Sequence, residues 1–271
     1  MVQDLWCKAW PLISPVALVL LGHQIMQNQH VPSIGPRYWG ALCIASVCGA
    51  NMGDFIAGRL GLGHIRGLPI LAVILAIIFL IERRDRNGHE VYYWSAIIVV
   101  RTAATNLADI DINLGWVWKV TGLTILLVIA VLSGRFLAPQ STIEMCNAGG
   151  AGLPKTDSYY WASMLVAGTL GTVIADVMSF DSGLGLGKAS IYLSVILGAW
   201  FYISRGVLRA TPFYWITIVL VRAAGTAVGD YLARSLGLTM STILTGQQLV
   251  ITVLLGDSKV DPNFPPTRSA R

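Results

Sequence analysis

A Tyr-Trp pair followed by an aspartate recurs four times along this chain, always with fourteen residues in between. The copies read "YWGALCIASVCGANMGD", "YWSAIIVVRTAATNLAD", "YWASMLVAGTLGTVIAD" and "YWITIVLVRAAGTAVGD". The residues between the aromatic pair and the aspartate are mostly apolar and long enough to form most of a membrane-spanning helix. Four segments of one fixed length therefore predict four equivalent helices that begin on the same side of a membrane.

Composition supports a membrane protein. The chain has 271 residues, of which 55% are hydrophobic and only 12% are charged, whereas a soluble domain carries about 25% charge. Apolar segments long enough to span a bilayer are expected at roughly 38–60, 67–82, 92–111, 115–134, 159–179, 188–204, 212–233 and 239–256. The fold class expected is an all-α polytopic membrane protein of eight helices, with a ninth left open at 9–27, and the lipid bilayer is its first partner.

The spacing of the four copies also predicts an internal duplication. Copies one and three lie about as far apart as copies two and four, and only copies two and four carry an arginine, Arg101 or Arg222, eight residues before the aspartate. Four tandem two-helix repeats arranged as a duplicated pair explain both observations. The division expected is an N-terminal segment at 1–30, repeats one and two at 31–134, a cytoplasmic linker at 135–157, repeats three and four at 158–256, and a C-terminal tail at 257–271.

Basic residues are distributed unequally between the two sets of expected turns. Eleven Lys and Arg residues fall in the turns that precede the Tyr-Trp pairs or in the C-terminal tail, and four fall in the other set. The positive-inside rule places the first set, with the C-terminus, in the cytoplasm. Because topology explains the net charge of +5, nucleic acid is not an expected partner. The location expected is the inner membrane of a bacterium.

One stripe of each Tyr-Trp helix is polar. An arc of roughly 80° around the helix contains four positions: the Trp, the residues eight and four before the aspartate, and the aspartate itself. A charged side chain facing lipid costs about 2.5–3.5 kcal/mol or more, so the stripe should face the bundle interior or a water-filled cavity. The candidate solute-binding or ion-binding residues are Asp54, Asp109, Asp176, Asp230, Asn51, Asn106, Thr172, Thr226, Arg101 and Arg222.

Several of these residues have a purely structural alternative. The aspartates can instead cap the helices that follow them or hydrogen-bond between repeats, and the Tyr-Trp pairs are expected to anchor the helices at the membrane interface. Arg101 and Arg222 are expected to pair with a carboxylate of their own or a neighbouring repeat. Small residues five and one positions before each aspartate should let the helices approach closely, and a Leu-Gly step after each aspartate should form the turn to the second helix.

The four quoted stretches resemble the bacterial membrane proteins built from four tandem repeats of unknown function, each with two membrane helices and a characteristic tryptophan. The resemblance covers about 31–256. It implies the repeat architecture and no established activity.

Function must therefore be inferred from the residues. The first hypothesis is a transporter for a small solute or ion, and the carboxylates favour a cation. Parallel repeats with a site at their interface are a known transporter arrangement. The alternative is a non-transporting membrane scaffold or sensor whose polar columns only hold helices together. An enzyme and a cofactor are not expected, a metal site is undecided, and homo-oligomerisation is left open.

Overall fold

All regular elements in the described part of the chain are helical. The computed structural model describes residues 32, 34–85, 89–110, 114–137, 156–204 and 211–257. The helices are α3 (Pro36–Asp54), α4 (Gly63–Arg84), α5 (Glu90–Ala108), α6 (Trp116–Leu137), α8 (Ser158–Asp176), α9 (Leu186–Ile203), α10 (Thr211–Leu236) and α11 (Leu238–Asp257), with π-helical turns η2 (Phe55–Arg59) and η3 (Val177–Asp181). The segment at 1–30, most of the linker at 135–157 and nearly all of the tail at 257–271 lie outside the described residues.

Local sequence explains where several helices begin and end. Pro36 occupies the first turn of α3, where its missing N–H needs no partner. The Asp157 side chain accepts a hydrogen bond from the backbone N–H of Tyr160 and so caps α8. Gly237, between α10 and α11, has a φ of 84°, a conformation that side chains disfavour. Of the four Leu-Gly steps predicted as turns, only the one at Gly115 lacks a positive φ.

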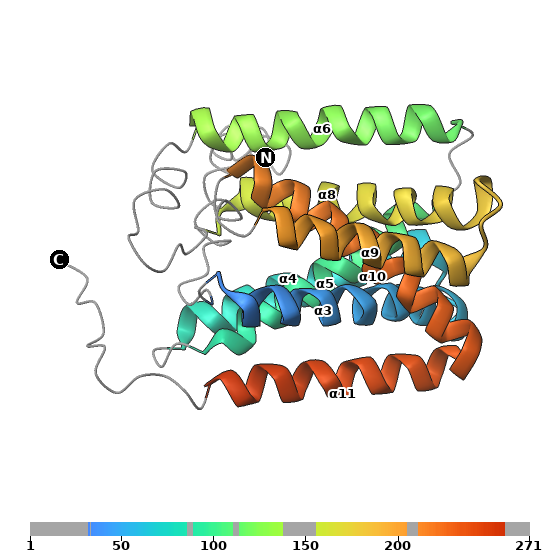
Figure 1. Cartoon of the computed structure of the whole chain (residues 1–271). Helices are drawn as coiled ribbons and strands as arrows, with labels where there is room; N and C mark the ends of the chain where they lie inside the picture. Colours follow the sequence, from blue (N-terminus) through green and yellow to red (C-terminus); the bar gives the residue numbers. More distant parts are fainter. Residues whose placement is uncertain are drawn as a thin grey trace, which may run out of the picture.

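The four Tyr-Trp helices form a closed ring. Helix α3 packs against α5, α5 against α8, α8 against α10, and α10 against α3. The second helix of each pair lies outside this ring and packs on the Tyr-Trp helix of the next pair: α4 on α5, α6 on α8, α9 on α10, and α11 on α3. The helices run side by side along one direction, with α6 and α11 at opposite edges of the view (Figure 1). We call α3, α5, α8 and α10 the inner helices and the others the outer helices.

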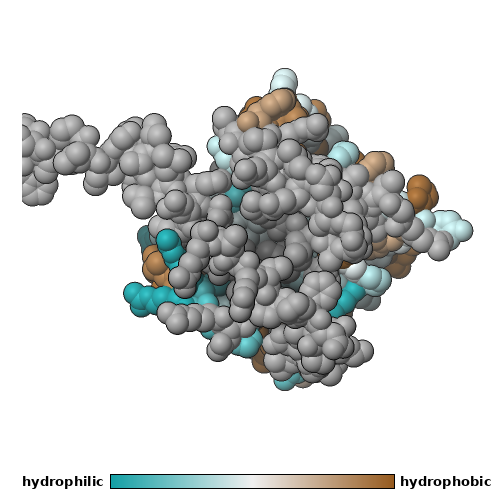
Figure 2. Space-filling view, turned by 90° about the vertical axis from the view of Figure 1, so that its left-hand side faces the viewer, coloured by the Kyte–Doolittle hydropathy of each residue, from teal (hydrophilic) through white to brown (hydrophobic). Residues whose placement is uncertain are grey.

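The outer helices present an apolar surface outward. Large hydrophobic side chains that are about half exposed include Val73 and Ile77 of α4, Ile125 and Ile129 of α6, Ile191 and Val195 of α9, and Ile243 and Val250 of α11. Among the coloured residues of Figure 2, brown hydrophobic side chains lie around the rim of the bundle, and teal hydrophilic ones gather at the lower left. An apolar exterior around an interior that contains arginines is expected of a protein surrounded by lipid.

Among the described residues, six helices are long and apolar enough to cross a membrane: α3 with η2, α4, α6, α8 with η3, α9 and α10. Helix α11 has a shorter apolar stretch, Leu238–Val253, and α5 is not among the six. Helix α5 packs against α3, α4 and α8. Because these neighbours cover it, α5 can carry Arg101 and fewer apolar residues than a helix that faces lipid.

Candidate functional site

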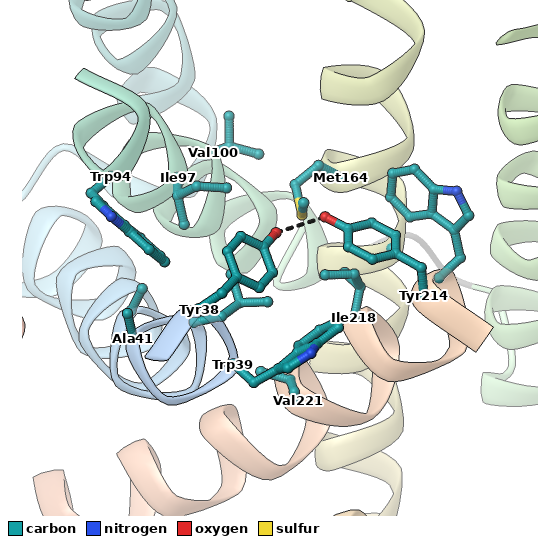
Figure 3. Packing of buried hydrophobic residues seen from close by; sticks show 14 of the residues in the cluster. Tyr38, Trp39, Ala41, Trp94, Ile97, Val100, Met164, Tyr214, Ile218 and Val221 are labelled. Carbon is teal, nitrogen blue, oxygen red and sulfur yellow. Dashed lines mark hydrogen bonds between the residues drawn. The ribbon is translucent and has the colours of Figure 1, made fainter. Parts of the chain in front are cut away.

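Four tyrosine hydroxyls form a closed hydrogen-bonded ring at the end of the bundle where the inner helices begin. The hydroxyl oxygens of Tyr38 and Tyr93 lie 2.8 Å apart, those of Tyr93 and Tyr160 2.7 Å, those of Tyr160 and Tyr214 3.1 Å, and those of Tyr214 and Tyr38 2.7 Å. The Tyr38–Tyr214 bond is drawn in Figure 3. We call these four residues the tyrosine tetrad. Each helix of the inner ring contributes one member.

The tetrad closes the axis of the ring. Four oxygens on a square with these sides lie about 2 Å from its centre, and a water oxygen requires about 2.7 Å from each neighbour. Each tryptophan packs against the tyrosine of the preceding pair: Trp94 against Tyr38, Trp161 against Tyr93, Trp215 against Tyr160 and Trp39 against Tyr214, with ring centroids 5.6–6.0 Å apart. These tilted contacts bring the tryptophan and tyrosine rings within the range at which aromatic pairs stabilise one another.

The expectation that the Tyr-Trp pairs anchor the helices at the membrane interface is therefore wrong. The tyrosines are at most 4% exposed and the tryptophans at most 8%. The hydroxyls satisfy one another inside the ring of helices and do not reach lipid headgroups. The sequence contained a signal for this arrangement, because a tyrosine stands at the same distance before all four aspartates.

An apolar layer lies one turn further along the inner helices. It consists of Leu42, Ile97, Met164 and Ile218, none of which has exposed surface. Figure 3 shows Met164 and Ile218 close to the Tyr38–Tyr214 bond. Arg101, one turn further along α5, reaches back to this layer, where its Nη2 donates to Met164 Sδ (3.8 Å).

The small residues let neighbouring inner helices come into backbone contact. A Cβ at Gly49 would overlap Arg101 Cβ, and one at Gly225 would overlap Ser46 Cβ. At Gly171 an added Cβ would lie 2.7 Å from Arg222 Cβ. In each contact, the glycine lies five residues before the aspartate of its own helix. The residue it meets lies eight residues before the aspartate of the neighbouring inner helix. Small residues are expected where helices cross this closely.

Arg222 binds all three of the other inner helices. Its Nε donates to Thr172 Oγ1 (3.0 Å) on α8, its Nη1 to the Ser46 carbonyl (3.0 Å) on α3, and its Nη2 to the Arg101 carbonyl (3.1 Å) and Thr105 Oγ1 on α5. The side chain is fully buried. The guanidinium therefore lies on the axis of the ring, where it links the four inner helices.

Arg101 is equally buried but has few partners. Its Nη2 donates to Met164 Sδ (3.8 Å), and neither Nε nor Nη1 has a partner. Within the described residues neither Arg101 nor Arg222 forms an ion pair, so the expected pairing with a carboxylate is wrong. The physical reason is depth: each arginine stands two helical turns before the aspartate of its own helix, and the nearest acceptors are carbonyls and hydroxyls.

The four carboxylates gather at the opposite end of the inner ring from the tyrosine tetrad. Each interacts electrostatically with the other three, and all four side chains are half-buried. Asp109 Oδ2 also lies 3.5 Å from His64 Nδ1 on α4. Three or more His, Cys, Asp or Glu side chains do not converge on a metal-sized site anywhere in the described part of the chain.

A pocket of about 350 Å³ opens beside one of these carboxylates. Asp176 and Asp181 line it together with Lys119 of α6 and residues of the α5–α6 turn. A lysine opposite two carboxylates makes the pocket polar and places charges of both signs at its wall. Neither Lys119 nor His64 was among the residues predicted for the site, because both lie on outer helices, outside the repeated stripe.

The remaining predicted residues lie between the arginine layer and the carboxylates. Thr172 and Thr226 hydroxyls are 3.3 Å apart. Asn51 Nδ2 donates to Ser241 Oγ (2.6 Å) on α11. Asn106 is fully buried, and neither polar atom of its amide has a partner.

Taken along the axis, the inner ring thus presents the tyrosine tetrad, an apolar layer, two arginines with threonines, and four carboxylates. A helical bundle with this interior and an apolar exterior has the character of a polytopic membrane protein. A family model described as Repeat of Unknown Function (DUF347) matches residues 213–256. No curated protein and no solved structure matches the chain. The matched residues cover nearly all of α10 and α11, so the predicted resemblance to a repeat family of unknown function is confirmed.

Proposed function

We propose that this chain is a membrane transporter for a small solute or ion, with a cation as the favoured solute, and that the pathway follows the axis of the inner helices. The observation that carries the proposal is the convergence of four half-buried carboxylates at one mouth of that axis. Carboxylates held close together repel one another unless a positive charge binds. Such a mouth would concentrate small cations.

Two further features support a pathway that is closed in this arrangement. The tyrosine tetrad leaves no opening at its centre, and Arg222 occupies the axis between the tetrad and the carboxylates. A guanidinium on the axis opposes the passage of a cation. Transport under this proposal requires the tetrad to open and Arg222 to leave the axis, while the solute enters at the carboxylates.

The membrane arrangement is part of the same proposal. We infer eight spans, with α5 and α11 crossing beside the six long apolar helices, and four tandem two-helix repeats arranged as a duplicated pair. The unequal distribution of basic residues supports a cytoplasmic tetrad end and C-terminus, and a carboxylate end that faces outward. The proposed location is the inner membrane of a bacterium.

The alternative, a scaffold or sensor that transports nothing, has its own supporting observation. The tetrad satisfies its own hydrogen bonds, and Arg222 is satisfied by uncharged oxygens. Polar groups that are fully paired in a dry core stabilise helix association. Under this alternative the carboxylates have no role in transport. The capping role expected for them is not seen at Asp54 or Asp176, since neither forms a side-chain cap hydrogen bond.

The test is a flux assay on the purified full chain in liposomes. Uptake of sodium, potassium, protons and divalent cations would be compared for the wild type and for Asp54→Asn, Asp109→Asn, Asp176→Asn and Asp230→Asn. Asp85→Asn is the matched control, because Asp85 follows α4 at the tetrad end. Transport lost in the four variants and kept in the control supports the proposal. No flux of any cation by folded wild-type protein favours the scaffold.

A further inference from the structure

Arg101 is a fully buried cation for which the described residues supply no anion. Two of its three side-chain nitrogens lack any partner, and the third meets only the Met164 thioether at 3.8 Å. A thioether sulfur is a weak acceptor. A guanidinium removed from water without a counter-charge is strongly destabilising, so a negative charge at this position would be strongly stabilising.

The comparison with Arg222 shows why Arg101 is left unpaired. Both arginines stand eight residues before an aspartate, on opposite sides of the inner ring. Arg222 Nε binds the hydroxyl of Thr172, which lies four residues before the aspartate of the preceding pair. The corresponding residue for Arg101 is Ala50, which offers no hydroxyl. Arg222 also occupies the centre of the ring, so a second guanidinium cannot enter the same layer.

The surroundings of Arg101 contain donors and a second positive charge. Arg101 reaches toward the tetrad, because its one contact, Met164 Sδ, belongs to a side chain that lies beside the Tyr38–Tyr214 bond (Figure 3). It also interacts with Arg222, whose hydrogen-bond partners are all uncharged. Hydroxyl hydrogens rotate freely, so a tetrad hydroxyl can turn from its neighbour and donate to an anion.

We propose that a small monovalent anion of chloride size binds between the free N–H groups of Arg101 and the tyrosine tetrad. The guanidinium supplies two N–H donors and the charge, and the tetrad supplies O–H donors. The apolar layer around the site is fully buried, which favours a small ion with one charge over phosphate or a carboxylate. The bound anion compensates Arg101 and stabilises the closed axis, and this inference does not depend on whether the protein transports cations.

The experiment uses the full chain purified in detergent. Sodium chloride is titrated against sodium gluconate at constant ionic strength, and the unfolding temperature is measured at each step. Binding to the folded state predicts that the unfolding temperature rises with the logarithm of the chloride concentration, by about 4 °C over the titration. Gluconate gives no such rise, because it is too large for the site. Arg101→Gln should abolish the rise. Arg66→Gln, which changes an exposed arginine of α4, should keep it.

A second measurement covers the case in which Arg101→Gln does not fold. Tyr93→Phe removes one hydroxyl of the tetrad and should raise about tenfold the chloride concentration needed for a given rise in unfolding temperature, which corresponds to one lost charge-assisted hydrogen bond. Bromide soaked into crystals of the wild type should give an anomalous peak beside Arg101. Equal unfolding temperatures in chloride and gluconate for the wild type, with no bromide peak at Arg101, would overturn the inference.

Discussion

The hydroxyl oxygens of Tyr38 and Tyr214 lie 2.7 Å apart although 176 residues separate them in the chain. This bond joins the first inner helix to the last and closes the ring of four. The same hydroxyl of Tyr38 also meets that of Tyr93 at 2.8 Å. Removal of the Tyr38 hydroxyl therefore breaks two of the four hydrogen bonds of the tetrad.

Tyr38→Phe should lower the free energy of unfolding by about 1–3 kcal/mol, because a buried hydrogen bond contributes about 1 kcal/mol and the two neighbouring hydroxyls each lose a partner. The change can be measured as a shift of the thermal transition in detergent. Tyr192→Phe is the control, since Tyr192 is 52% exposed on α9. Equal stability of the two variants would show that the tetrad does not hold the ring closed.

Glycine replacements within α3 should differ sharply in effect. Gly49→Ala puts a methyl group against Arg101 of α5 and should destabilise the protein by about 1–3 kcal/mol through overpacking. Gly40→Ala on the same helix meets nothing within 4 Å and should be neutral or stabilising, because Ala favours a helix over Gly by about 1 kcal/mol. A destabilisation of similar size in both would indicate that the close crossing of α3 and α5 is not where the structure places it.

Arg222→Lys should destabilise the protein more than Arg101→Lys. A lysine ammonium is a point charge without the planar fork of arginine, and it cannot reach Thr172, the Ser46 carbonyl and the Arg101 carbonyl together. Arg101 loses only the Met164 contact. The unfolding temperatures of the two variants, measured in gluconate so that no chloride binds at Arg101, give the comparison. The reverse order would contradict the central role assigned to Arg222.

Asp230→Asn should raise the unfolding temperature of the cation-free protein at pH 8. Asp230 interacts electrostatically with the other three carboxylates, and its neutralisation removes like-charge repulsion. The gain should shrink as salt screens the remaining charges. If Asp230→Asn instead destabilises the protein under these conditions, the carboxylate acts as a hydrogen-bond acceptor.

The proposed orientation can be checked with single cysteines in a background that lacks the four native ones. Ser182→Cys, in the exposed turn after η3, should react with a membrane-impermeant maleimide in intact cells. Ser258→Cys, in the C-terminal tail, should react only after the cells are opened. Labelling in the opposite pattern would invert the topology inferred from the basic residues.

The positions of the helices could be read from the sequence, because apolar runs of membrane length and the Tyr-Trp-x14-Asp spacing leave few alternatives. The inward direction of the polar stripe followed from the energy of a charge in lipid, and Arg101, Arg222 and Thr172 are indeed buried. The small residues before each aspartate were correctly expected to permit close contact.

Contacts between helices of different Tyr-Trp repeats could not be predicted from the sequence in the same way. The sequence places Tyr38 and Tyr93 at equal depth, but their hydroxyls meet only because the helices close into a ring, and no local pattern encodes that closure. The arginines were assigned to carboxylates on charge alone, whereas distance along the helix puts carbonyl and hydroxyl oxygens nearer. The difference between Ala50 and Thr172 was visible in the sequence, yet its meaning depends on which helices are neighbours.

The packing of each outer helix on the next inner helix has a consequence for biosynthesis. Helix α4 reaches its partner α5 as soon as that helix is made, but α11, the last of the described helices, can pack on α3 only after it leaves the ribosome. The nascent chain is therefore an open arc that circularises only once α11 has been made. An arc that fails to circularise exposes complementary faces, through which two chains can exchange α11 and form an intertwined dimer.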